Sequence, residues 1–304
     1  MCGSSNEQHS LLRVHGALTA VAILFSSNYI ISKLAMNSFS PMTFAYLRVV
    51  GAAIVLSALT AREPSPRLRG EGRVRGDLGR ITLYSILGVA LNQSLFLAGL
   101  SLTSAHVAAI LITSVPLFAL AAAMVLGHER GTPAKIGGIA LAAFGALLVV
   151  GAEGFAGALR SLIGDLLILA NSLCFALYLV LSKPMMSRVS ARQMITWMFG
   201  IASVLMLPLA AASLAHENWR GIPERAWIAL AAVIAGPTVA AYLLNAWALA
   251  HADSSLVAAY TYLQPVITTV LAAIFLGERI RAVAIVAGVL IFAGVYLAGG
   301  ARKL

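Results

Sequence analysis

Long apolar segments alternate with short polar connections along almost the whole chain. Ten segments of roughly 20 residues can be delimited, and this is the length that a helix needs to cross the hydrocarbon core of a bilayer. Membrane-spanning strands would instead give short stretches of alternating polarity. The pattern therefore predicts an all-α integral membrane protein with ten transmembrane helices. The expected spans are 14–34, 41–60, 81–100, 103–126, 134–151, 161–181, 192–213, 227–249, 254–276 and 280–299.

The second half of the chain repeats the first at an offset of about 150 residues. Lys33 corresponds to Lys183, Pro116 to Pro265, and Glu129-Arg130 to Glu278-Arg279. Chance similarity between Ala-rich helices is the alternative, but it does not account for a proline, a lysine and a Glu-Arg pair that also align. Because five spans is an odd number, the second copy enters the membrane from the opposite side. We therefore expect two inverted five-helix repeats, residues 1–152 and 153–304, around one central site.

Composition agrees with the membrane interpretation and excludes a water-soluble domain. Of the 304 residues 60% are hydrophobic and only 11% are charged, against about a quarter charged in soluble domains. The net charge of +10 does not indicate nucleic-acid binding, because six arginines of the 61–80 loop have no interleaved aromatic residues. With the N-terminus in the cytoplasm, 14 Lys and Arg residues lie inside and six outside. This asymmetry predicts a plasma membrane protein, in bacteria of the inner membrane, with both termini cytoplasmic.

Several short motifs recur at the ends of the spans. Ser32-Lys33 closes the first span, Arg48 follows Pro41 in the second, and Gln264-Pro265 precedes Leu276-Gly277-Glu278-Arg279. In this order and spacing the chain resembles the EamA-type transporters of the drug/metabolite transporter superfamily. The resemblance implies a ten-helix, pseudo-symmetric carrier, often an exporter of amino acids or related metabolites. The first copy departs from the pattern, because His128 is inserted between Gly127 and Glu129.

Helical spacing places polar and aromatic side chains on single faces of several spans. Tyr242 and Asn245 share a face with Thr238, and Tyr260 shares one with Gln264. Polar groups are costly in hydrocarbon, so these faces indicate a central cavity; hydrogen bonds between packed helices are the alternative. The predicted substrate-binding residues are Asn28, Arg48, Tyr84, Asn92, Gln93, Tyr178, Tyr242, Asn245, Tyr260 and Gln264.

The repeat gives this expected cavity an aromatic side and an amide side. Asn28 and Asn92 correspond to Tyr178 and Tyr242 in the second copy. Such a lining suits a small amphipathic solute, and a neutral or aromatic amino acid exported by alternating access is the predicted substrate. Arg48 has two interpretations: an anchor for the substrate carboxylate, or an arginine bound to carbonyls or extended toward the surface. A multidrug exporter of cations, a membrane enzyme and a non-transporting scaffold are the alternative functions.

No span carries Asp or Glu near its middle, which argues against a proton-driven antiporter or a cation exporter and favours facilitated diffusion. The sequence contains no nucleotide-binding glycine loop, metal-ligand cluster or nucleophile–base pair, so we expect no enzyme activity, cofactor or metal. The expected partners are a small-molecule substrate and the lipid bilayer, with a monomer sufficient for transport.

Three prolines within spans are predicted hinges, because proline removes a backbone hydrogen bond and bends a helix. They are Pro116, Pro237 and Pro265.

Polar residues near the span ends are expected to have structural roles and not to bind the solute. Lys33 should extend toward the surface, His106 should be structural or interfacial, and Glu278 should mark a helix end.

Overall fold

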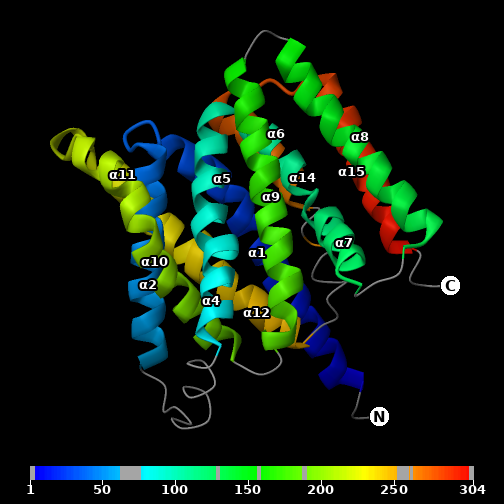
Figure 1. The fold of residues 1–304 in the computed structure, drawn as a ribbon, viewed down its shortest axis with the longest axis horizontal. Helices are drawn as coiled ribbons and strands as arrows, with labels where there is room; N and C mark the ends of the chain where they lie inside the picture. The colour runs from blue at the N-terminus through cyan, green and yellow to red at the C-terminus, as the bar shows by residue number, and fades with distance from the viewer. Residues whose placement is uncertain are drawn as a thin grey trace.

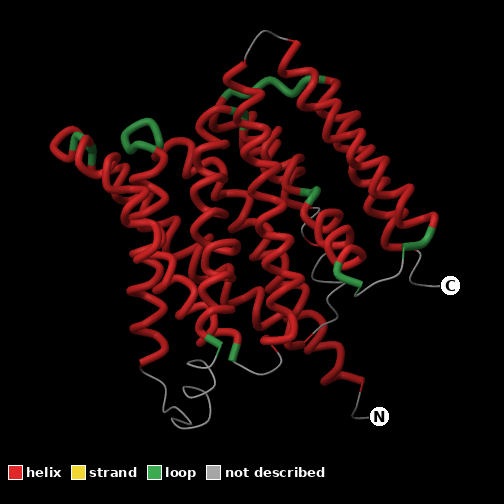
Figure 2. Tube along the Cα trace, in the orientation of Figure 1, coloured by secondary structure: helices red, strands yellow, loops and turns green. Residues whose placement is uncertain are grey.

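The computed structural model describes residues 4–61, 77–127, 131–155, 159–186, 190–251, 260 and 263–300. Within these ranges the chain is almost entirely helical and contains no strand (Figure 2). The helices are α1 Ser4–Ala35, α2 Pro41–Ala61, α4 Leu78–Ser85, η1 Ile86–Ala90, α5 Leu91–Leu102, α6 Ala105–Ile112, α7 Val115–Val125, α8 Pro133–Phe155, α9 Leu159–Met186, α10 Ala191–His216, η2 Trp219–Gly221, α11 Glu224–Val233, η3 Ile234–Ala240, α12 Ala241–His251, α14 Leu263–Leu276 and α15 Ala282–Gly300.

Seven helical segments of the described chain are long and apolar enough to cross a membrane. Three shorter apolar helices, within α8, α14 and α15, coincide with the remaining expected spans. The all-helical membrane architecture is thus confirmed, whereas the count of ten spans and their inverted arrangement stay predictions. The seven long segments are 13–35, 41–61, 78–102, 105–125, 159–182, 192–216 and 224–245.

The helices pack mainly in pairs formed between the two halves of the chain. α2 packs against α10, α1 against α14, and α7 against α9. α8 and α15 lie side by side at one edge of the bundle and form the most extensive of these contacts (Figure 1). The helices of the first half of the chain are therefore packed mainly against helices of the second half.

Two of the expected spans contain a widened π-helical segment. η1 lies between α4 and α5, and η3 lies between α11 and α12. At the predicted offset of 150 residues, Ile86–Ala90 corresponds to residues 236–240, which lie inside η3. Such segments are rare and frequently occur at functional sites, so they draw attention to the residues that they carry.

The predicted hinge prolines lie at helix starts or irregularities. Thr113 and Ser114 separate α6 from α7, and Pro116 is the second residue of α7. The expected span at 103–126 is therefore a broken helix rather than a bent one. Pro265 is the third residue of α14, and Pro237 lies inside η3.

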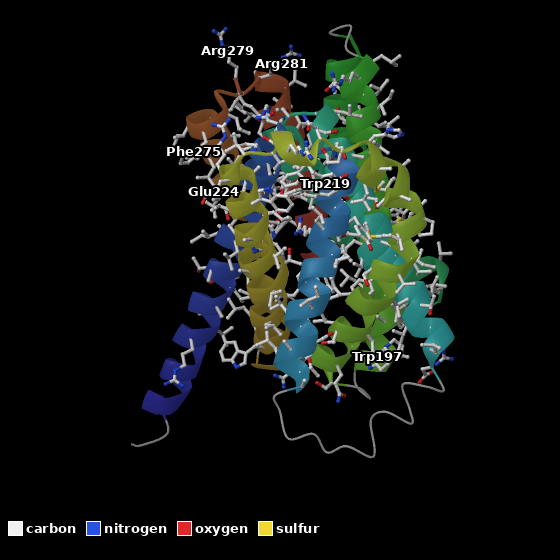
Figure 3. The ribbon with its side chains drawn as sticks, turned by 90° about the vertical axis from the view of Figure 1, so that its left-hand side faces the viewer. Trp197, Trp219, Glu224, Phe275, Arg279 and Arg281 are labelled. Carbon is white, nitrogen blue, oxygen red and sulfur yellow. The ribbon has the colours of Figure 1, made fainter. Side chains whose placement is uncertain are left out.

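The two ends of the bundle carry different side chains. Arg279 and Arg281 lie at one end together with Trp219 and Glu224, whereas Trp197 lies at the other (Figure 3). Trp197, Trp219 and Trp227 are substantially exposed, as expected of aromatic side chains at the two interfaces of a bilayer. We refer to these as the Arg279 end and the Trp197 end; the predicted topology places the Arg279 end outside the cell.

Candidate substrate site

Arg48 lies inside the bundle with its charge removed from water. It is the eighth residue of α2, about 10 Å along the helix from Pro41, and only 2% of its surface is exposed. Its Nε donates a hydrogen bond to Thr238 Oγ1 at 2.7 Å. Its Nη1 has no hydrogen-bond partner in the described part of the chain, and none of the ion pairs found there includes Arg48. A buried cation without a counter-ion is costly, so this guanidinium is suited to receive an anion.

The position of Thr238 follows from the proline that precedes it. Pro237 has no N–H to donate along the helix, and this leaves the carbonyl of Val233, four residues earlier, without its usual donor. The hydroxyl of Thr238 donates to that Val233 carbonyl at 2.8 Å. Since its hydrogen is used there, the oxygen presents a lone pair to Arg48. Pro237 and Thr238 therefore fix the guanidinium from the side of η3.

Tyr242 continues this group one helical turn after Thr238. Its ring makes edge contacts with Phe25 of α1 and Phe199 of α10, with ring centroids 6.2 and 5.7 Å apart. The phenol also interacts electrostatically with Arg48, and the Gln93 amide lies beside it. An aromatic enclosure next to a guanidinium whose Nη1 has no partner among the described residues is suited to a solute with a carboxylate and an apolar body.

An amide cluster adjoins this group on α5 and α9. Asn92 Oδ1 accepts from Gln93 Nε2 at 3.3 Å, and the Asn92 backbone carbonyl accepts from Asn171 Nδ2 at 2.6 Å. Gln93 is 4% exposed, and its Oε1 has no partner among the described residues. The structure thus brings together four predicted site residues, Arg48, Asn92, Gln93 and Tyr242, in one central group.

Two further predicted residues, Tyr84 and Tyr178, form a pair beside this group, because the Tyr178 phenol interacts electrostatically with Tyr242. The rings of Tyr84 and Tyr178 lie 6.4 Å apart, and the Tyr84 hydroxyl donates to the Leu181 carbonyl at 2.8 Å. Gly88 of η1 faces Tyr178, where a Cβ would lie only 2.7 Å from the ring. Tyr84 also lines a cavity of about 510 Å³ between α4 and α9, which Asp77 and Arg80 border.

The remaining predicted residues have other neighbours. Tyr260 is hydrogen-bonded through its hydroxyl to His15 Nδ1 at 2.6 Å. Asn28 Oδ1 accepts from Ser32, and the Gln264 carbonyl accepts from Ser26. No hydrogen bond of the Asn245 side chain is seen in the described chain. A cavity-facing role for these four residues stays a prediction.

Several contributors were not predicted from the sequence. Phe199 encloses Tyr242, and His15 binds Tyr260 across 245 residues of sequence. Phe199 is one of many apolar residues in its span, so no local signal distinguishes it. His15 carried a signal, because a polar ring among apolar residues near the start of a span needs a partner.

Comparisons with known proteins agree with the architecture. The model of the EamA-like transporter family matches residues 14–151 and again 162–300. An uncharacterised transporter of Archaeoglobus fulgidus is 26% identical over 94% of this chain and 96% of its own. A probable terminal-alkyne amino-acid exporter of Streptantibioticus cattleyicolor is 26% identical over 92% of this chain and 91% of its own. One solved crystal structure, 20% identical, matches with a TM-score of 0.64 over 94% of this chain and 96% of its own, which shows a common fold.

Proposed function

Because the chain belongs to the EamA-like transporter family, we propose that it exports neutral amino acids with sizeable apolar or aromatic side chains. The amino acid crosses the cytoplasmic membrane by alternating access, with the central group around Arg48 as its binding site. The expected contributors are Arg48, Tyr242, Gln93 and Asn92, and the other predicted residues line the path toward either end.

The observation that carries this proposal is the buried guanidinium of Arg48. Its Nε is held by Thr238, while its Nη1 has no partner in the described chain. A substrate carboxylate would neutralise the charge and bind through a short, charge-assisted hydrogen bond. The apolar side chain of the substrate would then lie against Tyr242, whose neighbours Phe25 and Phe199 complete an aromatic wall.

The relatives support the same class of substrate. The Streptantibioticus cattleyicolor protein, which matches nearly the full length of this chain, is named as a probable exporter of a terminal-alkyne amino acid. Such a solute combines an amino-acid head with an apolar side chain, and a site built from Arg48 and Tyr242 suits both parts.

Coupling to protons is not part of the proposal. In the described chain, Asp165 lies in the seventh position of α9 and is not near the middle of the helix. A proton-coupled carrier commonly uses an acidic side chain in its pathway. We therefore expect the solute to move down its own gradient.

The test compares two solutes that differ only in the carboxylate. Purified protein in liposomes should transport L-phenylalanine in preference to phenethylamine. Arg48→Met removes the cation, so phenylalanine transport should fall by about 10- to 100-fold, from the loss of a charge-assisted bond worth about 1.5–3 kcal/mol. Phenethylamine transport should not fall.

Arg225→Met provides a matched control, because Arg225 is an exposed arginine in the first turn of α11. It should leave both rates unchanged. Equal loss of both solutes in the Arg48 variant would refute the carboxylate assignment, and faster transport of phenethylamine than of phenylalanine in the parent would favour a cation exporter.

A further inference from the structure

Glu278 forms a dense polar cluster at the Arg279 end of the bundle. Its Oε1 accepts from Lys33 Nζ at 3.0 Å and from the Ala105 backbone N–H at 2.8 Å. Its Oε2 accepts from His106 Nδ1 at 2.7 Å and from the His106 backbone N–H at 3.2 Å. One carboxylate thus closes the N-terminus of α6, whose first N–H groups have no partner within the helix.

The turn that follows α14 positions the Glu278 carboxylate against α6. Gly277 follows the last residue of α14 and has φ of 64°, a left-handed conformation that favours glycine. The Glu278 N–H then bonds back to the Ala272 carbonyl at 3.2 Å, which turns the chain sharply out of the helix. The turn directs the Glu278 side chain to α6 and away from the water that surrounds Arg279.

The cluster connects helices that are distant in the sequence. Lys33 of α1 also donates to the Thr103 carbonyl, which follows α5, at 2.6 Å. The Thr103 hydroxyl in turn donates to Asp165 of α9. Four helices, α1, α6, α9 and α14, are therefore tied at one end of the bundle. The prediction that Lys33 extends toward the surface is wrong, because its ammonium group is bound inside this cluster.

Charge holds the cluster together. Burial raises the pKa of Glu278, but the hydrogen bonds from His106 and Ala105 and the charge of Lys33 outweigh it and hold that pKa at about 2. The carboxylate is ionised at neutral pH, and it faces both the Lys33 cation and the positive end of the α6 dipole. Only 12% of the Glu278 side chain and 6% of the His106 side chain are exposed, so water competes weakly for these bonds.

We propose that Glu278 is the positioning residue of a gate, which closes the Arg279 end by holding α14 and α1 on the N-terminus of α6. The inference rests on the alternating access of the proposed function. A carrier must open each end in turn, and this end opens only when the Glu278 carboxylate leaves α6. Lys33 and His106 set how strongly the closed state is favoured.

The test measures opening without any substrate, so it does not depend on the identity of the solute. The native thiols are first replaced (Cys2→Ser, Cys174→Ser), and a reporter thiol is introduced by Ser32→Cys. Ser32 is fully buried and adjacent to Lys33. Full-length protein in lipid nanodiscs, which expose both faces, is then treated with a membrane-impermeant charged thiosulfonate, and the rate of thiol modification is recorded.

Glu278→Gln should raise this rate by at least about tenfold, within the range usual for a coupled conformational equilibrium. Glu224→Gln is the matched control, because Glu224 is exposed at the same end of the bundle (Figure 3) and should leave the rate unchanged. Lys33→Met keeps the cap on α6 and should give a smaller increase, and it serves as the readout if the Glu278 variant does not fold.

An unchanged rate in Glu278→Gln, or in Lys33→Met where that variant is the readout, would overturn the gate. An equal increase in Glu224→Gln would do so as well, because it would mean general loosening of the bundle. Failure of amino-acid transport with a positive labelling result would reject the proposed substrate and leave the gate in place.

Discussion

At the scale of single residues, Thr238 shows how one hydroxyl can serve two functions. It donates to the Val233 carbonyl the hydrogen bond that Pro237 cannot donate, and it accepts a hydrogen bond from Nε of Arg48. The same oxygen thus stabilises an irregular helix and orients a cation. Orientation matters because Nη1 has to face the solute, and a mobile guanidinium would lose entropy on binding.

This double use predicts an asymmetry between two substitutions of Thr238. Thr238→Val keeps the shape of the side chain but removes the hydroxyl, so the Val233 carbonyl and Arg48 Nε both lose a partner. The KM for L-phenylalanine should rise about tenfold or more, and the protein should also be less stable by about 1–3 kcal/mol. Thr238→Ser retains the hydroxyl and should resemble the parent in both measurements. Equal behaviour of the two variants in proteoliposome transport would contradict this role.

The sequence predicted most members of the central group but not their contacts. Arg48, Gln93 and Tyr242 could be identified because polar side chains within apolar spans are costly and rare. Their convergence depends on how α2, α5 and α12 approach one another, and spacing within a single span carries no such information. Tyr260 illustrates the limit: it shares a helical face with Gln264, yet its hydroxyl is bound to His15 of α1.

At the scale of helices, close packing depends on small residues at the crossing points. α5 and α9 approach closely where Gly99 faces Gly164, and a Cβ on Gly99 would lie 2.8 Å from the Gly164 carbonyl oxygen. Without a hydrophobic force between helices in lipid, such close contacts contribute much of the association. This crossing lies next to Thr103 and Asp165, so it also supports the cluster around Glu278.

Gly99→Ala should therefore destabilise the protein. The added methyl meets backbone, which cannot rotate away, and overpacking of this kind costs about 1–3 kcal/mol. Gly200→Ala in α10 makes the same chemical change where the added methyl would have no side chain and no backbone of another helix within 4 Å, and should not lower stability. Thermal unfolding in detergent measures both variants, and a loss for Gly99→Ala no larger than for Gly200→Ala would count against the packing argument.

Helix type and position were predictable because apolar length is a strong signal in a membrane protein. The break between α6 and α7 and the two π-helical segments were not. Proline marked two of these places, at Pro116 and Pro237, but a proline can bend, break or widen a helix. Which of these occurs depends on whether a neighbour such as Thr238 satisfies the freed carbonyl.

At the scale of the whole molecule, three sets of contacts join α1 to the segment from Tyr260 to Glu278. They lie at His15–Tyr260, at Ser26–Gln264 and at Lys33–Glu278. The central group around Arg48 lies inside this bundle, and the Lys33–Glu278 contact closes its Arg279 end. A solute held at Arg48 would thus require rearrangement of α1 against α14 to leave by that end. This arrangement is what the alternating-access proposal requires.

Counterflow of L-phenylalanine is the measurement that tests the central claim most directly. Liposomes containing the purified protein are loaded with unlabelled phenylalanine, diluted into radiolabelled phenylalanine, and followed without any ion or pH gradient. An alternating-access carrier that binds this solute should accumulate the label transiently above equilibrium. The reason is that unlabelled phenylalanine inside the liposome binds the inward-facing site and returns it to the outward-facing state, where labelled phenylalanine binds next. Arg48→Met should abolish the accumulation. Absence of counterflow in the parent, or accumulation only when a pH gradient is imposed, would contradict the account.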